Sequence, residues 1–120
     1  MQASVDDISY DRQFDVLVAL SIFESLTESQ VLSFLCRARA WTRQALFATI
    51  PSFQQEEEEF SRKDNHDLSH ITIKSRQWWH ELFLRAGWRQ DYLHRIVERM
   101  CQAHSLPTKM GWKVYVYAPE

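Results

Sequence analysis

The seven residues from Phe14 to Leu20, FDVLVAL, constrain the fold of this chain more than any other stretch. They are nearly continuous in apolar side chains and rich in valine and leucine. A strand that is covered on both faces has this composition, whereas a strand with one wet face alternates apolar and polar residues. We therefore predict a buried strand here, of the kind found in a parallel sheet with helices above and below.

A helix and a second strand are expected next. Thr27 and Gln30 have the spacing of a capping box, in which the threonine hydroxyl accepts a backbone N–H of the first turn. Apolar residues then recur at helical spacing, namely Val31, Phe34, Leu35, Ala38 and Trp41. This pattern predicts a helix from about Glu28 to Arg43, and ALFATI, which ends at Pro51, predicts a short buried strand. Strand, helix and strand in this order form one right-handed crossover unit.

The second half of the chain predicts two helices and a closing strand. Residues 52–68 are polar and acidic, and we expect a mobile polar loop there. Ser75 is a candidate N-cap of a helix that ends at Gly87, with an apolar face of Trp78, Trp79, Leu82, Phe83 and Ala86. Another amphipathic helix carries Leu93, Ile96, Val97, Met100 and Cys101. The final run, GWKVYVYAP, alternates valine and tyrosine, which predicts a strand at or near a sheet edge.

Composition limits the classes of partner. With 120 residues and 45% hydrophobic content, the chain is long enough for one core and too short for two domains. The net charge of −2 gives no reason to expect nucleic acid or an anionic membrane as partner. Cys36 and Cys101 lack ligand spacing and fall in apolar helical patterns, so we predict buried, reduced thiols. We find no apolar run of about 20 residues and no secretory signal, and therefore expect a cytoplasmic protein.

Taken in order, four segments resemble the class I S-adenosylmethionine-dependent methyltransferases. FDVLVALSIFESL resembles the family's fourth strand and the following turn, and FLCRARAWTRQALFATIP resembles the next helix and fifth strand. DLSHITIKSRQWWHELFLRAGW is similar to the segment that leads into the helix after the fifth strand, and GWKVYVYAP to the closing antiparallel strand. The resemblance implies an α/β fold: a partial Rossmann-like sheet of parallel strands plus a terminal antiparallel strand, flanked by helices. Residues 1–120 would then form the C-terminal half of such a domain.

The scarcity of glycine bears on the cofactor. In this family S-adenosylmethionine rests on a Gly-x-Gly-x-Gly turn, where the backbone must approach the ligand closely. This chain contains only Gly87 and Gly111. The resemblance therefore implies a methyltransferase fragment that acts on a small-molecule acceptor but needs an absent N-terminal half for activity. The alternative is a non-enzymatic interaction protein derived from such a half-domain, which self-associates through an exposed strand edge.

The resemblance also nominates residues for the cofactor. Asp6 and Asp7 both match an acidic side chain that contacts the adenine amino group, although a turn aspartate with no ligand fits the same sequence. Ala19, Leu20 and Ser21 close the first strand, at the carboxyl edge where α/β folds bind ligands. Glu24, shortly after them, matches a family acid that has either a structural role or a site role.

The residues nominated for the acceptor lie in the segment DLSH and the helix after it. His70 would deprotonate an acceptor hydroxyl during methyl transfer, or would simply order its loop through a backbone hydrogen bond. Asp67 belongs to the same segment. Successive helical residues point about 100° apart, so we expect one of Trp78 and Trp79 to pack on the sheet and the other to cover the loop or acceptor pocket. His66 and His70 lack a third partner, and no metal site is predicted.

Overall fold

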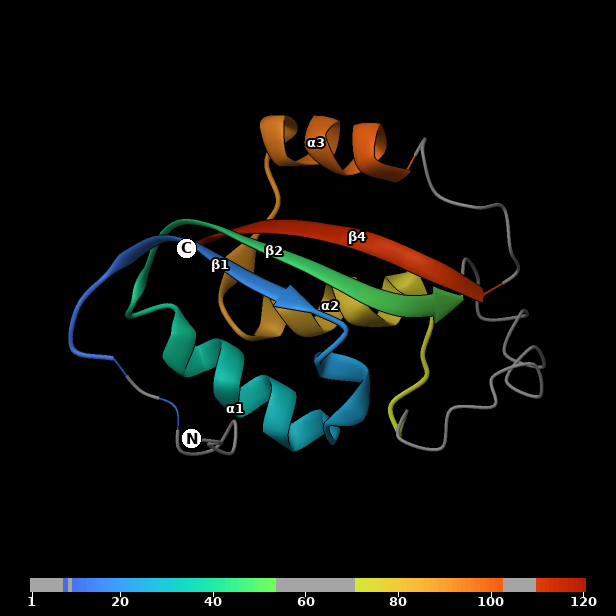
Figure 1. Cartoon of the computed structure of the whole chain (residues 1–120), viewed down its shortest axis with the longest axis horizontal. Coiled ribbons are helices and arrows are strands. Elements are labelled where there is room, and N and C mark those ends of the chain that lie inside the picture. The colour runs from blue at the N-terminus through green and yellow to red at the C-terminus, as the bar shows by residue number, and fades with distance from the viewer. Residues whose placement is uncertain (1–7, 9, 54–70, 103–109) are drawn as a thin grey trace.

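A mixed sheet of four strands organises the chain in the computed structural model, which describes residues 8, 10–53, 71–102 and 110–120 (Figure 1). The elements in chain order are β1 (Phe14–Leu20), the 3₁₀ helix η2 (Phe23–Ser25), α1 (Glu28–Ala38), β2 (Thr42–Phe53), α2 (Arg76–Arg85), β3 (Trp88–Arg89), α3 (Tyr92–Gln102) and β4 (Met110–Pro119). Within the described ranges, no helix is long and apolar enough to cross a membrane.

The strand order is β1-β2-β4-β3. β1 runs parallel to β2, with Ala19 opposite Ala48, and the two are joined by the crossover through η2 and α1. β4 runs antiparallel to β2, with Ala48 opposite Tyr115. Among the described residues, the two of β3 are the ones that pair with the far side of β4. The partial Rossmann-like sheet is confirmed. The last strand was expected nearer the sheet edge than the two apolar runs before it, but β4 lies between β2 and β3, and β1 is an edge strand among the described residues.

Helices cover the two faces of the sheet unequally. α1 and α2 lie together on one face, and α3 lies on the other (Figure 1). The core fills the space between the sheet and the first two helices; its members include Ala19, Phe23, Leu35, Leu46, Ala48, Ile50, Trp79, Phe83, Trp88, Tyr115 and Tyr117. Trp88 donates its indole N–H to the carbonyl of Leu35 at 2.9 Å, which fixes β3 to α1. On the other face, α3 packs chiefly on β4.

The predicted capping box is present, but α1 is shorter than expected. The Thr27 hydroxyl accepts the backbone N–H of Gln30 at 3.2 Å. The helix ends at Ala38 and not at Arg43, because the chain tightens into two i→i+3 turns and the Trp41 carbonyl then accepts the backbone N–H of Phe14 at 2.7 Å. The apolar period continued past the end of the helix because Trp41 reaches the same core from the turn.

β2 is longer than predicted and runs through Pro51 to Phe53, so the first residues of the predicted loop belong to this strand. The rest of that loop lies outside the described residues. A proline is tolerated in this strand because β1 pairs with β2 only as far as Thr49. The Thr49 carbonyl faces β1, so the nitrogen of Pro51, two residues on, points to the same side, beyond the end of the neighbouring strand.

β1 is not covered on both faces, and this prediction was wrong. Val16, Val18 and Leu20 keep 49%, 55% and 56% of their surface exposed, while Leu17 and Ala19 on the opposite face pack on the core. The reason is that α3 lies over β4, and no strand in the described part of the chain pairs with the outer edge of β1. The first strand therefore ends the sheet with an apolar surface.

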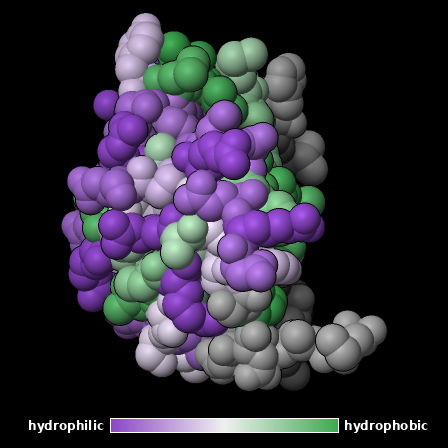
Figure 2. Space-filling view, turned by 90° about the vertical axis from the view of Figure 1, so that its left-hand side faces the viewer, coloured by the Kyte–Doolittle hydropathy of each residue, from purple (hydrophilic) through white to green (hydrophobic). Residues whose placement is uncertain are grey.

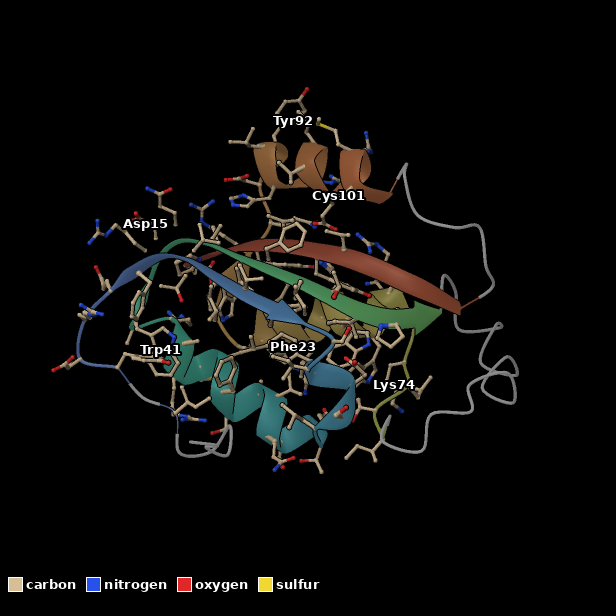
Figure 3. The ribbon with its side chains drawn as sticks, in the orientation of Figure 1. Asp15, Phe23, Trp41, Lys74, Tyr92 and Cys101 are labelled. Carbon is tan, nitrogen blue, oxygen red and sulfur yellow. The ribbon has the colours of Figure 1, made fainter. Side chains whose placement is uncertain are left out.

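The two cysteines also differ from expectation. Both are free thiols, but Cys36 is exposed and Cys101 is only half-buried. Cys36 lies between residues that α1 turns toward the core, and helical periodicity alone did not separate it from them. α3 likewise leaves apolar side chains in water: Tyr92, labelled in Figure 3, points away from the sheet, and Leu93 and Met100 are exposed. Figure 2 shows hydrophobic side chains at the top of an otherwise mainly hydrophilic end of the molecule, where α3 lies.

Candidate functional site

The carboxyl ends of β1 and β2 meet at the edge where open α/β sheets bind ligands. Ala19 is buried, Leu20 is exposed, and Ser21 begins the turn that follows. Ser21 has a positive φ of 58°, which is uncommon for a residue other than glycine. Its N–H donates to the carbonyl and the hydroxyl of Thr49, at 3.1 and 3.2 Å. These bonds tie the ends of the two parallel strands and leave the Ser21 side chain exposed at the ligand edge.

The segment that enters α2 is held against the turn after β1. The Glu24 carbonyl accepts backbone N–H groups from Ile71 at 2.9 Å and from Thr72 at 3.0 Å. The Thr72 hydroxyl donates to the carbonyl of Leu26. Glu24 itself is completely buried. The two pieces that the sequence assigned to one site, the turn after β1 and the segment before α2, are therefore in direct contact.

The tryptophan pair divides as predicted between the core and a more open position. Ser75 caps α2 by accepting the backbone N–H of Trp78 at 3.1 Å. Trp79 is completely buried in the core, and Trp78 is half-buried with its ring edge-on to that of Trp79 at 5.0 Å. The Lys74 ammonium lies 5.6 Å from the centre of the Trp78 ring, on the segment that leads into α2 (Figure 3). Of the two indoles, only Trp78 is placed to meet a ligand.

Several nominated residues lie outside the described residues: Asp6, Asp7, Asp67 and His70. Their assignments stay predictions. Among the residues that are described, no group of three or more histidine, cysteine, aspartate or glutamate side chains is placed to hold a metal ion.

An apolar cavity of about 150 Å³ lies beneath β1, and no pattern in the sequence predicted it. Phe23 and Trp41 line it from the space between the sheet and α1 (Figure 3), and Leu17 and Ala19 line it from the strand. Tyr10 closes it from a segment without regular structure, with its ring edge-on to Trp41 at 5.4 Å. A residue that lines a cavity from such a segment leaves no periodic pattern in the sequence.

Sequence reasoning also missed a polar cluster at the far edge of the sheet. Arg76 of α2 pairs with Glu98 of α3, which is buried at 2% exposure. Burial raises the pKa of the Glu98 carboxyl above its ordinary value, and the charge of Arg76 opposes that shift. These residues are 22 positions apart on different helices, so no local motif in the sequence predicts the pair.

Comparison with known proteins identifies the fold. No model of a known protein family matches the chain, and no curated protein does. Among solved structures, the S-adenosylmethionine-dependent methyltransferase SibL superposes with a TM-score of 0.68 at 14% identity, over 99% of this chain and 35% of SibL. The magnesium protoporphyrin IX methyltransferase ChlM of Synechocystis PCC 6803, with bound S-adenosylhomocysteine, superposes with a TM-score of 0.61 at 6% identity, over 100% of this chain and 50% of ChlM. HEN1, a methyltransferase of small RNA, superposes with a TM-score of 0.64 at 11% identity, over 98% of this chain and 15% of HEN1.

The chain has a class I methyltransferase-like fold. β4 runs antiparallel to β2, as the resemblance implied for the closing strand, and the short strand β3, which was not predicted, pairs with the other side of β4. The chain spans only about a third of the length of SibL.

Proposed function

We propose that this chain is the C-terminal half of a class I methyltransferase domain, and that it takes part in methyl transfer only when a glycine-rich half completes the cofactor site. The observation that carries the proposal is a sheet of methyltransferase-like order that, in the described part of the chain, stops at an open, apolar β1. The whole 120-residue sequence has two glycines, which lie in or beside α2 and β4 and not after a parallel strand.

The open side of β1 suits a further strand and helix. A hollow of about 430 Å³ lies over this face, lined mostly by apolar side chains, among them Val16 and Phe47 from the sheet and Leu93 and Val97 from α3. A parallel strand added to β1 would pair the backbone edge that no described strand occupies. The helix that follows such a strand would cover the hollow and bury the exposed valines. In the family that the chain resembles, the glycine-rich turn connects a strand of this sheet to a helix.

The cofactor would be S-adenosylmethionine, whose sulfonium carries the methyl group that is transferred. Support comes from the fold and from the ChlM structure, which contains S-adenosylhomocysteine. The described residues fit only part of such a site: Leu20 and Ser21 present exposed side chains at the carboxyl end of β1, and Ala19 supports them from the core. Asp6 and Asp7 are our candidates for the adenine contact.

The acceptor would be a small molecule that enters beside the segment before α2. We assign His70 the role of general base for an acceptor hydroxyl and Asp67 a contact to the acceptor. Trp78 would form one wall of the acceptor pocket, and the buried Trp79 would hold Trp78 in place through the edge-on contact between their rings. The main task of such a site is to hold the nucleophile in line with the methyl group. The net charge of −2 favours a small molecule over a nucleic acid.

The test uses the second half of the domain. The reading frames next to the coding sequence should be searched for a strand followed by Gly-x-Gly-x-Gly and a helix, and that segment should then be produced together with the 120-residue chain. We expect a one-to-one complex that binds S-adenosylhomocysteine and in which His70→Ala abolishes turnover without weakening cofactor binding. A complex that forms but does not bind S-adenosylhomocysteine would contradict the proposal.

A second candidate function rests on the same open strand. If the chain is a non-enzymatic interaction protein, the outer face of β1 is its binding surface, and no glycine-rich partner exists. In that case the chain should form a stable complex through β1 that is indifferent to S-adenosylhomocysteine. The co-production experiment separates the two functions, because only the methyltransferase half gains cofactor binding from its partner.

A further inference from the structure

A second polar space lies at the opposite edge of the sheet from β1. α2 and α3 occupy opposite faces of the sheet (Figure 1). An ion pair between Arg76 of α2 and Glu98 of α3 nevertheless joins the two helices. A cavity of about 300 Å³ is lined there by Arg76, Gln77, His80, Gln90, Arg95 and Tyr117. A neighbouring cavity of about 190 Å³ is lined by Arg76, Gln90, Arg95, Glu98 and Arg99. Because three residues line both, we treat them as one space and call it the β4-edge cavity.

Two of the charges in this cavity neutralise each other. Arg76 forms an ion pair with Glu98, and it also donates to the Val114 carbonyl on β4 at 3.2 Å. Its guanidinium lies 4.8 Å from the centre of the Tyr115 ring. Arg76 is therefore committed to holding the sheet edge, and its charge is balanced by a buried carboxylate.

The other two guanidinium groups have no such balance. Arg95 and Arg99 lie four residues apart on α3, and in the described segments no carboxylate pairs with either of them. Like charges at this spacing repel on a helix surface. The chain as a whole carries a net charge of −2, so this excess of two positive charges is a local property of the cavity.

His80 adds an imidazole to the cavity wall. Burial raises the pKa of Tyr117, so its phenol keeps its proton, and the phenol oxygen lies 2.6 Å from Nδ1 of His80. Burial, together with the charge of Arg76, lowers the pKa of His80, so the ring is neutral at pH 7. A neutral imidazole has one N–H donor and one acceptor nitrogen, so either the phenol or Nδ1 can be the donor in this bond. The cavity thus combines an imidazole with two guanidinium groups that pair with no carboxylate in the described segments.

We propose that the β4-edge cavity binds a small molecule through a phosphate group, with Arg95 and Arg99 as its main contacts. The planar guanidinium fork matches two phosphate oxygens, and such charge-assisted bonds are the stronger ones in proteins. The volume is in the range of small-molecule sites. A bound dianion would also relieve the repulsion between the two arginines. This site is independent of the proposed methyl transfer.

Inorganic phosphate is the probe for the test. The 120-residue chain should be titrated with phosphate at pH 7 and constant ionic strength, and binding followed by calorimetry, with circular dichroism as a check on folding. We expect saturable binding with a stoichiometry of one. The double variant Arg95→Ala/Arg99→Ala should weaken it by at least about tenfold, since it removes the charged partners of the anion.

A matched control distinguishes a site from general attraction. Arg43 and Arg85 are exposed arginines outside the cavity, and each is paired with an exposed carboxylate. The variant Arg43→Ala/Arg85→Ala changes the net charge equally and should bind phosphate as the original chain does. The variant Arg95→Lys/Arg99→Lys keeps the charge but not the fork and should bind with intermediate affinity. Equal weakening by both alanine pairs, or non-saturable binding by the original chain, would overturn the proposal.

Discussion

The open face of β1 makes the isolated chain prone to self-association, and Val18→Lys should suppress it. Val18 lies between Val16 and Leu20 on this face, and about half of each side chain is exposed. Complete burial of a valine or leucine is worth about 1.5–3 kcal/mol, so covering the exposed halves of the three contributes roughly 2–4 kcal/mol to an interface. A lysine in the middle removes part of this area and adds the cost of desolvating a charge.

The expected result is a rise of at least about thirtyfold in the dissociation constant of the self-associated form, since about 2 kcal/mol corresponds to that factor. Sedimentation velocity over a range of concentrations measures this constant. The melting temperature should hardly change, because a surface substitution of this kind costs within about 0.5 kcal/mol. Leu84→Lys is the control: Leu84 is also exposed and apolar, but it lies on α2. If both variants weaken association equally, or if the original chain stays monomeric at high concentration, the reasoning is refuted.

Three further predictions concern stability. Trp79→Ala should cost about 3–5 kcal/mol in urea denaturation because Trp79 is fully buried, and Trp78→Ala clearly less; equal costs would contradict the placement of the pair. Gly87→Ala should lower the free energy of unfolding by about 1–2 kcal/mol, because φ is +87° and a β-carbon would meet the Arg39 guanidinium. Adding Arg39→Ala should restore only the part of this loss that is due to the clash. Burial raises the pKa of Glu98, so the stability that its protonation adds is complete below its ordinary pKa of 4.5 and is lost as the pH rises through the raised value. Over that range the free energy of unfolding of Glu98→Gln should therefore rise relative to that of the original chain. A constant difference between the two would contradict this.

Local signals in the sequence predicted the elements well, because they report contacts between residues close together in the chain. The capping box of Thr27 and Gln30, the Ser75 cap and the left-handed glycine at Gly87 are all present. The order of the main elements, and with it the methyltransferase-like fold, also followed from the sequence, but the 3₁₀ helix η2 and the short strand β3 were not predicted. The proline at position 51 misled because it marks the end of pairing with β1 and not the end of β2.

Properties that depend on the rest of the fold could not be read in this way. The apolar composition of β1 indicates that both faces avoid water, but it does not reveal whether this chain or another supplies the cover. Cys36 is exposed because α1 has core contacts on one side only. The β4-edge cavity assembles Arg76, Arg95 and Tyr117 from three elements, and side chains gathered by tertiary packing share no spacing in the sequence.

The most direct test of the central claim is calorimetric titration of the purified chain with S-adenosylhomocysteine, with circular dichroism confirming that it is folded. The account predicts no binding by the folded chain alone, since the glycine-rich part of the cofactor site is not in its sequence. Micromolar binding by the chain alone would contradict it and would mean that these 120 residues form a cofactor site of their own.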